Sequence, residues 1–446
     1  MKIQILTFLI AFGLATAGNG QESPLDEYIR IGLTSNQTLQ QKQLQVEKAR
    51  LALKEAKGLF LPNLTFQADY TLADGGRKID LPVGDLLNPV YGTLNALTQS
   101  QSFPQIENVS EQFLPNNFHD TRLRMTLPVI NTEIWYLQKI RKAGITENEA
   151  QLIVYRRDLV RDIKTAYYNY LKADQAIKIY KQALLLQQEN LTLTQSLIRN
   201  DKLIPAAALQ IQAEISETKA HIAEADNNKL KAAAYLNFLI NKPLDSSVLI
   251  DEKLSASTNS NLAKNTREEL LQLNAGINQL KLNSELKKLS WTPTLGVFLD
   301  AGYQGFGYNF DTDQRYVLGG FQLKWNLFGG LQQQNKKRIA LNEVQSLESK
   351  TQEIERQLQL QLFTCEKNLS TAKAKYEANK ESVSFNDEAY RVIQIRYRDG
   401  QAIPIELTQA MFQKTKSEIQ ESISLIDIKI AEAEVERAAA SFQFNK

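Results

Sequence analysis

The sequence predicts a mainly α-helical protein with transmembrane β-structure, made of long antiparallel coiled-coil helices and four β-strands per chain. Three observations lead to this fold class. The chain of 446 residues repeats itself once. Each half contains a heptad pattern too long for a compact domain, and each half carries two stretches in which apolar and polar residues alternate. Internal repetition of this kind is the mark of an architecture built twice from one unit.

The repeat is defined by two pairs of matching landmarks. A helical pattern gives way to an alternating stretch at a proline step, at Pro62 and again at Pro293. Further along, Arg199–Pro205 matches Arg398–Pro404, and each of these two segments separates two helical patterns. Each half is therefore expected to contain the same order of helices, strands and turns.

Apolar residues recur every seven positions in both halves and in the same phase. Two apolar positions per heptad over this length are typical of coiled-coil packing. At 1.5 Å per residue, a helix of roughly 70 residues would be about 100 Å long. The first series is Ile163, Tyr170, Ile177, Leu184, Leu191 and Ile198, and the second is Leu362, Leu369, Tyr376, Val383, Tyr390 and Tyr397. Small residues line the second seam position: Ala166, Ala173, Cys365 and Ala372.

These landmarks set the expected bounds of the elements. The first repeat is expected over 18–240 and the second over 266–446, with a polar linker at 241–265. The first repeat would hold a helix at 25–60, strands at 63–72 and 120–129, a long helix at 131–199 and a return helix at 206–240. The second would hold a helix at 266–290, strands at 294–303 and 316–328, a long helix at 330–398 and a return helix at 405–440.

The four strands are about ten residues long, which suits strands that cross a bilayer at a tilt. A sheet of four strands leaves two open edges, which cannot be satisfied in lipid and are hazardous in water. Three chains would supply twelve strands, an even number that can close as an antiparallel barrel. The alternative is a water-soluble sheet packed on helices, but the apolar stripes of the helices are already used by one another.

A barrel of this kind needs a polar lumen and an aromatic belt. The charged residues expected to line the lumen are Asp69, Arg122, Arg124, Asp300 and Lys324. Aromatic residues at the junctions of strands and helices suit a membrane interface; they are Trp135, Trp291, Trp325 and Phe328. The connector at 73–119 is expected to be a long loop, a candidate lid or surface-exposed segment.

The N-terminus carries the pattern of a secretory signal peptide. Lys2 precedes an apolar run from Ile3 to Leu14, and Ala15-Thr16-Ala17 supplies a small-x-small cleavage signal. We expect a signal peptide over 1–17, with cleavage as late as residue 20. A short buried helix or a membrane anchor is the alternative interpretation, although the run is shorter than the roughly 20 residues of a spanning helix.

Composition argues against several classes of function. A net charge of +2 gives no electrostatic case for a nucleic-acid partner. Cys365 is the single cysteine, which excludes an internal disulfide and a thiolate metal cluster. His119 and His221 are too far apart in sequence for a two-histidine metal motif, and Glu217 and Glu224 flank His221 as helical pairing partners. With no nucleophile constellation and no phosphate loop, we expect neither an enzyme nor a cofactor or metal.

With its elements in this order, the sequence resembles the TolC-type outer-membrane efflux protein family. The resemblance covers nearly the whole mature chain. It rests on the proline steps at Pro62 and Pro293, on the strand exit Trp325–Gly330, and on the stretch Tyr397–Gly400 followed by Ile405–Ala410. No one of these motifs is specific alone, whereas their order and twofold repetition are.

The resemblance implies a homotrimer, with a twelve-stranded barrel in the outer membrane and an α-helical tunnel in the periplasm. It implies contact with outer-membrane lipid and two protein partners. These are a periplasmic adaptor (membrane fusion) protein and an inner-membrane transporter of the RND, ABC or MFS type. The trimer would be the passive exit duct of a tripartite efflux or type I secretion system, with no chemistry of its own.

The resemblance also implies a constriction at the periplasmic end. Tyr397 falls on the position of a tyrosine that holds this end shut, and Glu406 on that of an outer acidic ring. The sequence departs from the family at Ala402, where an arginine can occur, and at Gln409, where a second acid can. Together, the candidate gate residues are Tyr397, Arg398, Asp399, Gly400, Glu406 and Gln409. Glu406 can also be read as an ordinary acid in the first turn of a helix, paired with the helix dipole.

The turns that end the two long helices are apolar and terminal, so they are candidate docking tips for the adaptor or transporter. Their residues are Leu203, Ile204, Pro205, Ile403 and Pro404. The alternative is that they are ordinary helix-breaking turns. For the protein as a whole, the alternative to a duct is a secreted or envelope-spanning structural coiled coil without a pore. The cargo is not readable from the sequence.

Overall fold

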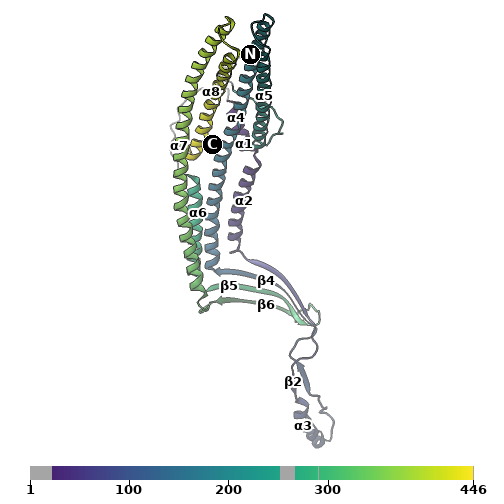
Figure 1. The fold of residues 1–446 in the computed structure, drawn as a ribbon. Helices are drawn as coiled ribbons and strands as arrows, with labels where there is room; N and C mark the ends of the chain where they lie inside the picture. The colour runs from purple at the N-terminus through teal and green to yellow at the C-terminus, as the bar shows by residue number, and fades with distance from the viewer. Residues whose placement is uncertain (1–22, 252–266, 290, 445–446) are drawn as a thin grey trace, which may run out of the picture. The chain divides into compact units, whose positions relative to one another are not determined.

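The computed structural model describes residues 23–251, 267–289 and 291–444 (Figure 1). The predicted signal peptide and residues 252–265 of the predicted linker lie outside the described residues. The chain forms two compact units. Of the described residues, the helical unit comprises 23–48, 144–251, 267–277 and 345–444, and the strand unit comprises 49–143, 278–289 and 291–344. Within the described ranges, no helix is both long and apolar enough to cross a bilayer.

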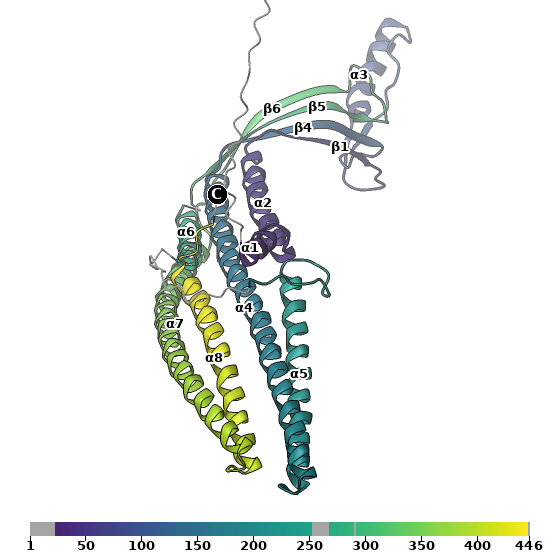
Figure 2. The same cartoon turned by 90° about the horizontal axis from the view of Figure 1, so that it is seen from above.

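Two long helical hairpins dominate the helical unit. Helix α4 (Thr132–Arg199) turns into α5 (Ala206–Leu239), and α7 (Gln332–Arg398) turns into α8 (Pro404–Ala439). In each hairpin the two helices lie side by side and run in opposite directions (Figures 1 and 2). The antiparallel coiled-coil arrangement expected from the heptads is confirmed. The heptad positions Ile163, Tyr170 and Ile177 are buried.

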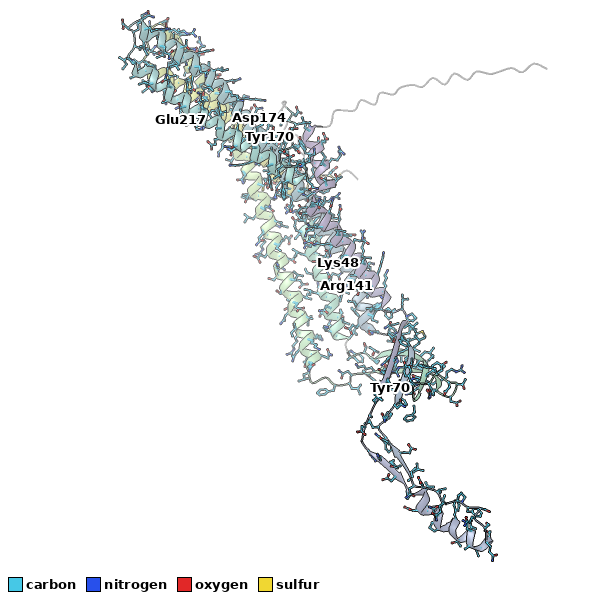
Figure 3. The ribbon with its side chains drawn as sticks, turned by 90° about the vertical axis from the view of Figure 1, so that its right-hand side faces the viewer. Lys48, Tyr70, Arg141, Tyr170, Asp174 and Glu217 are labelled. Atoms are coloured by element: carbon cyan, nitrogen blue, oxygen red, sulfur yellow. The ribbon has the colours of Figure 1, made fainter. Side chains whose placement is uncertain are left out.

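Charged side chains add to the packing of α5 on α4. Tyr170 and Asp174 lie one turn apart on α4 (Figure 3). The Lys229 ammonium of α5 lies 2.7 Å from Asp174 Oδ1 and 5.3 Å from the centre of the Tyr170 ring. Burial alone would raise the pKa of Asp174, but hydrogen bonds from Lys229 and Lys178 lower it. The carboxylate therefore stays ionised and holds the two helices in register.

The helix expected at 25–60 is two helices, α1 (Pro24–Ser35) and α2 (Gln37–Gly58). Asn36 causes the break, because its side chain serves both as a cap and as a tertiary contact. Its Oδ1 accepts the backbone N–H of Leu39 at 2.9 Å, and its Nδ2 donates to the Leu239 carbonyl at 2.8 Å. The helical pattern is therefore interrupted at Asn36, a buried polar residue that contacts α2 and the end of α5.

A buried ion-pair network joins α4, α8 and the start of α6 (Glu268–Lys288). The Arg157 guanidinium contacts both carboxylate oxygens of Glu268 at 2.8 and 2.6 Å. Glu269 accepts hydrogen bonds from Arg267 and from Arg437, each at 2.7 Å. Burial alone would raise the pKa of Glu269, but the two arginines lower it from 4.5 to about 2. The network fixes the N-terminus of α6 against the two long helices.

The strand unit contains one four-stranded antiparallel sheet in the order β1-β4-β5-β6 (Figure 2). Its strands are β1 (Asn63–Thr71), β4 (Phe118–Ile130), β5 (Thr294–Phe306) and β6 (Arg315–Lys324). The last strand was expected to run to residue 328 but ends at Lys324. Lys324 pairs with Thr294, the first residue of β5. Pro293 precedes Thr294 and has no N–H to extend the ladder.

The connector at 73–119 is not the plain loop expected from its Gly, Pro and Asn content. It holds a hairpin of β2 (Lys78–Leu81) with β3 (Val109–Gln112), and helix α3 (Val83–Thr98) between them. Asparagine side chains tie this segment together. Asn108 Oδ1 accepts the backbone N–H groups of Gly84 and Asp85 at the start of α3, and Asn95 exchanges two hydrogen bonds with Phe103. Residues that favour loops locally here act as tertiary contacts.

Candidate functional site

One face of the four-stranded sheet is polar and carries the predicted lumen residues. The pairings Gln67↔Arg122, Arg124↔Asp300 and Thr294↔Lys324 place these side chains on the same face, because directly paired residues share a face. Asp69 lies two residues from Gln67 on β1 and so belongs to this face as well. The sheet therefore gathers Asp69, Arg122, Arg124, Asp300 and Lys324 on one side.

The strongest contact on this face joins β4 to β5. Arg124 Nε and Nη2 donate to Asp300 Oδ1 and Oδ2 at 2.7 and 2.6 Å, a bidentate pair. Asp300 is only 1% exposed, so its charge is compensated inside the sheet. A planar guanidinium matched to a carboxylate fixes the positions of both side chains more tightly than a lysine would.

Three residues that sequence reasoning did not single out extend the network: Gln67, Asp120 and Tyr316. Arg122 forms an ion pair with Asp120 and donates to Gln67 Oε1 at 3.1 Å. The Tyr316 hydroxyl donates to Asp120 Oδ1 at 3.0 Å. Together these contacts link β1, β4 and β6. Asp120 lies two residues before Arg122 on β4, and Gln67 lies two residues before Asp69 on β1. Residues two apart on a strand share a face, so the alternation of the sequence could have revealed both.

Gly302 allows the backbones of β4 and β5 to lie close together beside Arg122. It pairs with Arg122 across the β4–β5 ladder. A Cβ at Gly302 would lie 2.2 Å from the Thr121 carbonyl oxygen and 2.7 Å from Arg122 Cα. Both are backbone atoms that cannot move aside, so the strands approach this closely only because residue 302 has no side chain.

The opposite face of the sheet is apolar and exposed. Phe321 is 79% exposed on β6. The other exposed large side chains on this face are Leu64, Phe66, Leu123, Leu299, Val317 and Leu323. A contiguous apolar face of this kind is unusual on the surface of a soluble monomer and marks a surface made to contact lipid or another chain.

The aromatic residues expected at the interface all lie where strands meet helices. Trp135 is in the first turn of α4, and its ring lies 3.4 Å below the Lys139 ammonium. Trp325 follows β6 and donates from Nε1 to the Trp291 carbonyl at 2.8 Å. Phe328 comes three residues later, and all four aromatic side chains are exposed. The rings therefore line the end of the sheet from which the helices leave.

His119 is a buried residue of β4 rather than a loop residue. Its Nε2 lies 2.8 Å from Gln314 Oε1, and its ring packs at 5.2 Å from both Tyr308 and Phe310. Among the described residues, no group of three or more His, Cys, Asp or Glu side chains could hold a metal ion. His221 lies 3.8 Å from both Glu217 and Glu224, which is the helical pairing its sequence spacing indicates.

Tyr397 is the buried centre of the helical tip. It is 1% exposed and packs in a cluster with Leu407 and Met411 of α8. Its hydroxyl lies 2.8 Å from the Thr194 hydroxyl of α4. Asn190, one turn before Thr194, contacts Met411. A single tyrosine thus joins the two helical hairpins through one polar contact and an apolar cluster.

The acidic and glycine residues near the tip have local structural roles. Glu406 is exposed, and its Oε2 accepts the Ile403 N–H at 3.3 Å, so its carboxylate caps the start of α8. Gly400 has a positive φ of 74° and ends α7, where its N–H donates to the Tyr397 carbonyl. Asp201 takes the same left-handed conformation at the end of α4. The two turns share their backbone geometry, as the sequence repeat predicts.

The remaining tip residues lie mainly at the surface. Arg398, Asp399 and Gln409 are exposed, whereas Ala402 is buried. In the two turns, Ile204, Pro205 and Ile403 are exposed, and Leu203 and Pro404 are half-buried. Of the six candidate gate residues, Tyr397 is therefore buried and the other five are exposed.

Over 94% of its length, the chain is similar in fold to outer-membrane channels. It aligns with the outer-membrane channel OprN at 14% identity and a TM-score of 0.77, over 94% of this chain and 90% of that one. The outer membrane protein VceC from Vibrio cholerae aligns at 13% identity and 0.76, over 94% and 96%. The open state of the Neisseria gonorrhoeae MtrE outer membrane channel aligns at 15% and 0.74, over 94% and 89%. No family model and no curated protein matches the sequence.

These alignments confirm the fold class. They extend over at least 89% of each chain compared.

Proposed function

We propose that the protein is a passive exit duct of the outer membrane. In this proposal three copies close their sheets into one twelve-stranded barrel, and the helical hairpins continue it as a tunnel into the periplasm. A periplasmic adaptor and an inner-membrane transporter bind the helical end, and the transporter supplies the energy. The duct itself catalyses no reaction.

The observation that carries the proposal is the two-sided sheet with open edges. Its polar face holds compensated charges, and its apolar face is exposed. The edge strands β1 and β6 run in opposite directions, because four successive antiparallel strands alternate in direction. Joining β6 of one copy to β1 of the next therefore continues the antiparallel ladder, and a closed ring removes every open edge.

The polar face then lines a water-filled lumen, and the apolar face contacts lipid. The aromatic side chains at the strand–helix junctions would lie at the periplasmic interface of the bilayer. At the helical end, the exposed turns around Ile204 and Ile403 are the proposed docking tips. Tyr397 and Glu406 are the proposed gate residues, one as a packing contact and the other as a charge near the threefold axis.

Cross-linking between edge strands tests the closure. In a Cys365→Ala background, a Gln67→Cys substitution on β1 is combined in turn with cysteine at Tyr316, Leu318 or Gly320 on β6. All four positions belong to the polar face. At least one combination should give disulfide-linked trimers of the detergent-purified protein.

The matched control moves the β1 cysteine by one residue, to Phe66, which is on the apolar face. Directly opposite residues of paired strands share a face, so this change should abolish cross-linking to the same β6 positions. A monomeric mass with no cross-linking in any combination would contradict the proposal. The secreted structural coiled coil would then be the better account.

A further inference from the structure

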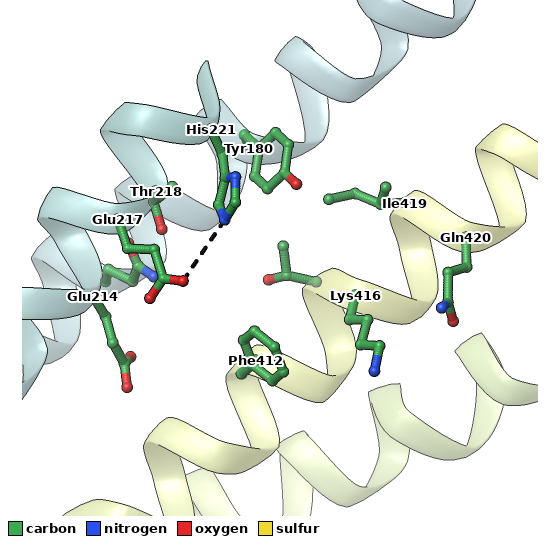
Figure 4. A pocket seen from close by; sticks show the side chains of 11 residues that line it. Tyr180, Glu214, Glu217, Thr218, His221, Phe412, Lys416, Ile419 and Gln420 are labelled. Carbon is green, nitrogen blue, oxygen red and sulfur yellow. Dashed lines mark ion pairs between the residues drawn. The ribbon is translucent and has the colours of Figure 1, made fainter. Parts of the chain in front are cut away.

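A cavity of about 330 Å³ lies in the helical unit, between the α4–α5 hairpin and α8. Figure 4 shows side chains of α5, among them Glu214, Glu217 and His221, facing Phe412 and Ile419 of α8. The volume is that of a small-molecule site. Glu217, Phe412 and Lys416 are exposed, so the cavity is open to solvent.

The walls of the cavity are largely aromatic and apolar. The His221 ring stacks on Tyr180 of α4, with the ring centres 5.1 Å apart and the planes 14° apart. Phe412 and Ile419 line the α8 side. Flat rings and a branched aliphatic chain suit the body of an organic ligand rather than a bare ion.

The cavity wall also contains a buried hydrogen-bond acceptor that nothing in the described chain satisfies. Gln187 of α4 is only 7% exposed, and its Oε1 has no hydrogen-bond partner among the described residues. Buried acceptors are normally paired, so an orphan in a cavity wall points to a donor that comes from outside. Glu214 is half-buried in the same wall, and no described cation forms an ion pair with it. Its burial and the nearby Glu217 raise the pKa of Glu214 to about 7.

We propose that this cavity binds a small organic cation that carries N–H donors on an aromatic or apolar body. The cationic group would donate to Gln187 and pair with Glu214, while the body packs between Tyr180 and Phe412. Charge-assisted hydrogen bonds of this kind are stronger than neutral ones. This site does not depend on the proposed duct, because ligand binding can be measured on the purified protein without any transport.

Binding should strengthen as pH rises through neutrality. The titratable and charged groups that face Glu214 and the ligand are Tyr180 on α4, Glu217 and His221 on α5, and Lys416 on α8. Because the raised pKa keeps part of Glu214 neutral near pH 7, a cation binds best once this carboxyl is ionised. Affinity should therefore increase from about pH 6 to about pH 8.

Isothermal titration of the intact protein in detergent with 4-aminobenzamidine tests the proposal. The neutral analogue 4-aminobenzamide has the same aromatic body without the charge. The amidine should bind saturably, and the amide should bind at least about tenfold more weakly. Glu214→Gln should weaken amidine binding by about tenfold or more, and Gln187→Met should weaken it severalfold.

The control variant is Asp226→Asn, an exposed acid on α5 that does not line the cavity. It should leave the affinity unchanged, whereas a loss equal to that of Glu214→Gln would mean a general charge effect and would overturn the proposal. Absence of saturable amidine binding, or equal binding of the neutral amide, would overturn it as well. The comparison of the two compounds uses the unmodified protein, so it decides the matter even if a variant fails to fold.

Discussion

The hydroxyl groups of Tyr397 and Thr194 lie 2.8 Å apart, almost fully buried, and join α7 to α4 at the helical tip. The contact lies beside an apolar cluster that includes Tyr397 itself and Leu407 and Met411 of α8. If the duct opens by movement of one hairpin relative to the other, this hydrogen bond must break. This contact would therefore couple the packing of the tip to the state of the proposed pore.

Removing one partner should favour the open state. Tyr397→Phe leaves the buried Thr194 hydroxyl without its partner, at a cost of about 1–3 kcal/mol to the closed arrangement. The open probability in single-channel recordings should rise accordingly. Tyr390→Phe is the matched control, because among the described residues the Tyr390 hydroxyl is hydrogen-bonded only to Gln394 of the same helix. An equal effect of both variants would show that the link between α7 and α4 is not what holds the tip.

Glu406 should contribute charge in addition to capping α8. Ala207 occupies its place in the first repeat, so in the proposed trimer each chain would bring one acid to the threefold axis. Glu406→Gln keeps an oxygen acceptor for the Ile403 N–H but removes the charge. We expect a lower cation-to-anion permeability ratio with unchanged assembly. Glu189→Gln, at an exposed acid of α4, serves as the control. An unchanged ratio in Glu406→Gln would leave the residue with a capping role only.

Gly302 should be intolerant of a side chain. In Gly302→Ala the new Cβ would meet backbone atoms of β4, which costs about 1–3 kcal/mol as overpacking. Thermal unfolding in detergent should show a less stable protein. In Gly296→Ala, on the same strand and face, the nearest atom to the new Cβ is the Leu127 carbonyl oxygen at 3.6 Å, so stability should hardly change. Equal stability of the two variants would mean that β4 and β5 are not paired as described.

Acid should weaken the ion-pair network around Glu269. The pKa of this carboxyl is about 2 in the folded protein and 4.5 ordinarily, so its contribution is present above about pH 4.5 and is lost as pH falls towards 2. The unfolding temperature of the unmodified protein should fall more steeply over this window than that of Glu269→Gln. At neutral pH the variant should be the less stable of the two. If the unfolding temperatures of the unmodified protein and of Glu269→Gln fell in parallel with pH, this role would be contradicted. Glu421→Gln, which lies outside the network, is the control and should follow the unmodified protein.

Much of the fold could be predicted from the sequence because it repeats local patterns. The heptads of α4 and α7 and the alternation in β1, β4, β5 and β6 depend on periodicity alone. Where a long-range contact decides, the sequence was misleading. Asn36 ends a helix because it bonds to Leu239, which is 203 residues away. The asparagines of the 73–119 segment look like loop formers but hold α3 in place.

The sequence predicted which residues belong to the polar face and to the helical tip, but not which residues they contact. Arg124 and Asp300 were both assigned to the polar face, yet nothing in the sequence sets the register that makes them a bidentate pair. Likewise, the sequence marks Tyr397 as a heptad position but does not identify Thr194 as its partner. The cavity lined by Gln187 was not predicted at all, because it forms where side chains of three helices, α4, α5 and α8, come together.

Single-channel recording of the detergent-purified protein in a planar bilayer is the most direct test of the duct. We expect insertion and small, long-lived, cation-preferring conductance steps, with Tyr397→Phe raising the open probability and Tyr390→Phe leaving it unchanged. A protein that stays soluble without detergent and never inserts would contradict the proposed duct. In that case the exposed apolar face of the sheet would serve contact with another protein rather than with lipid.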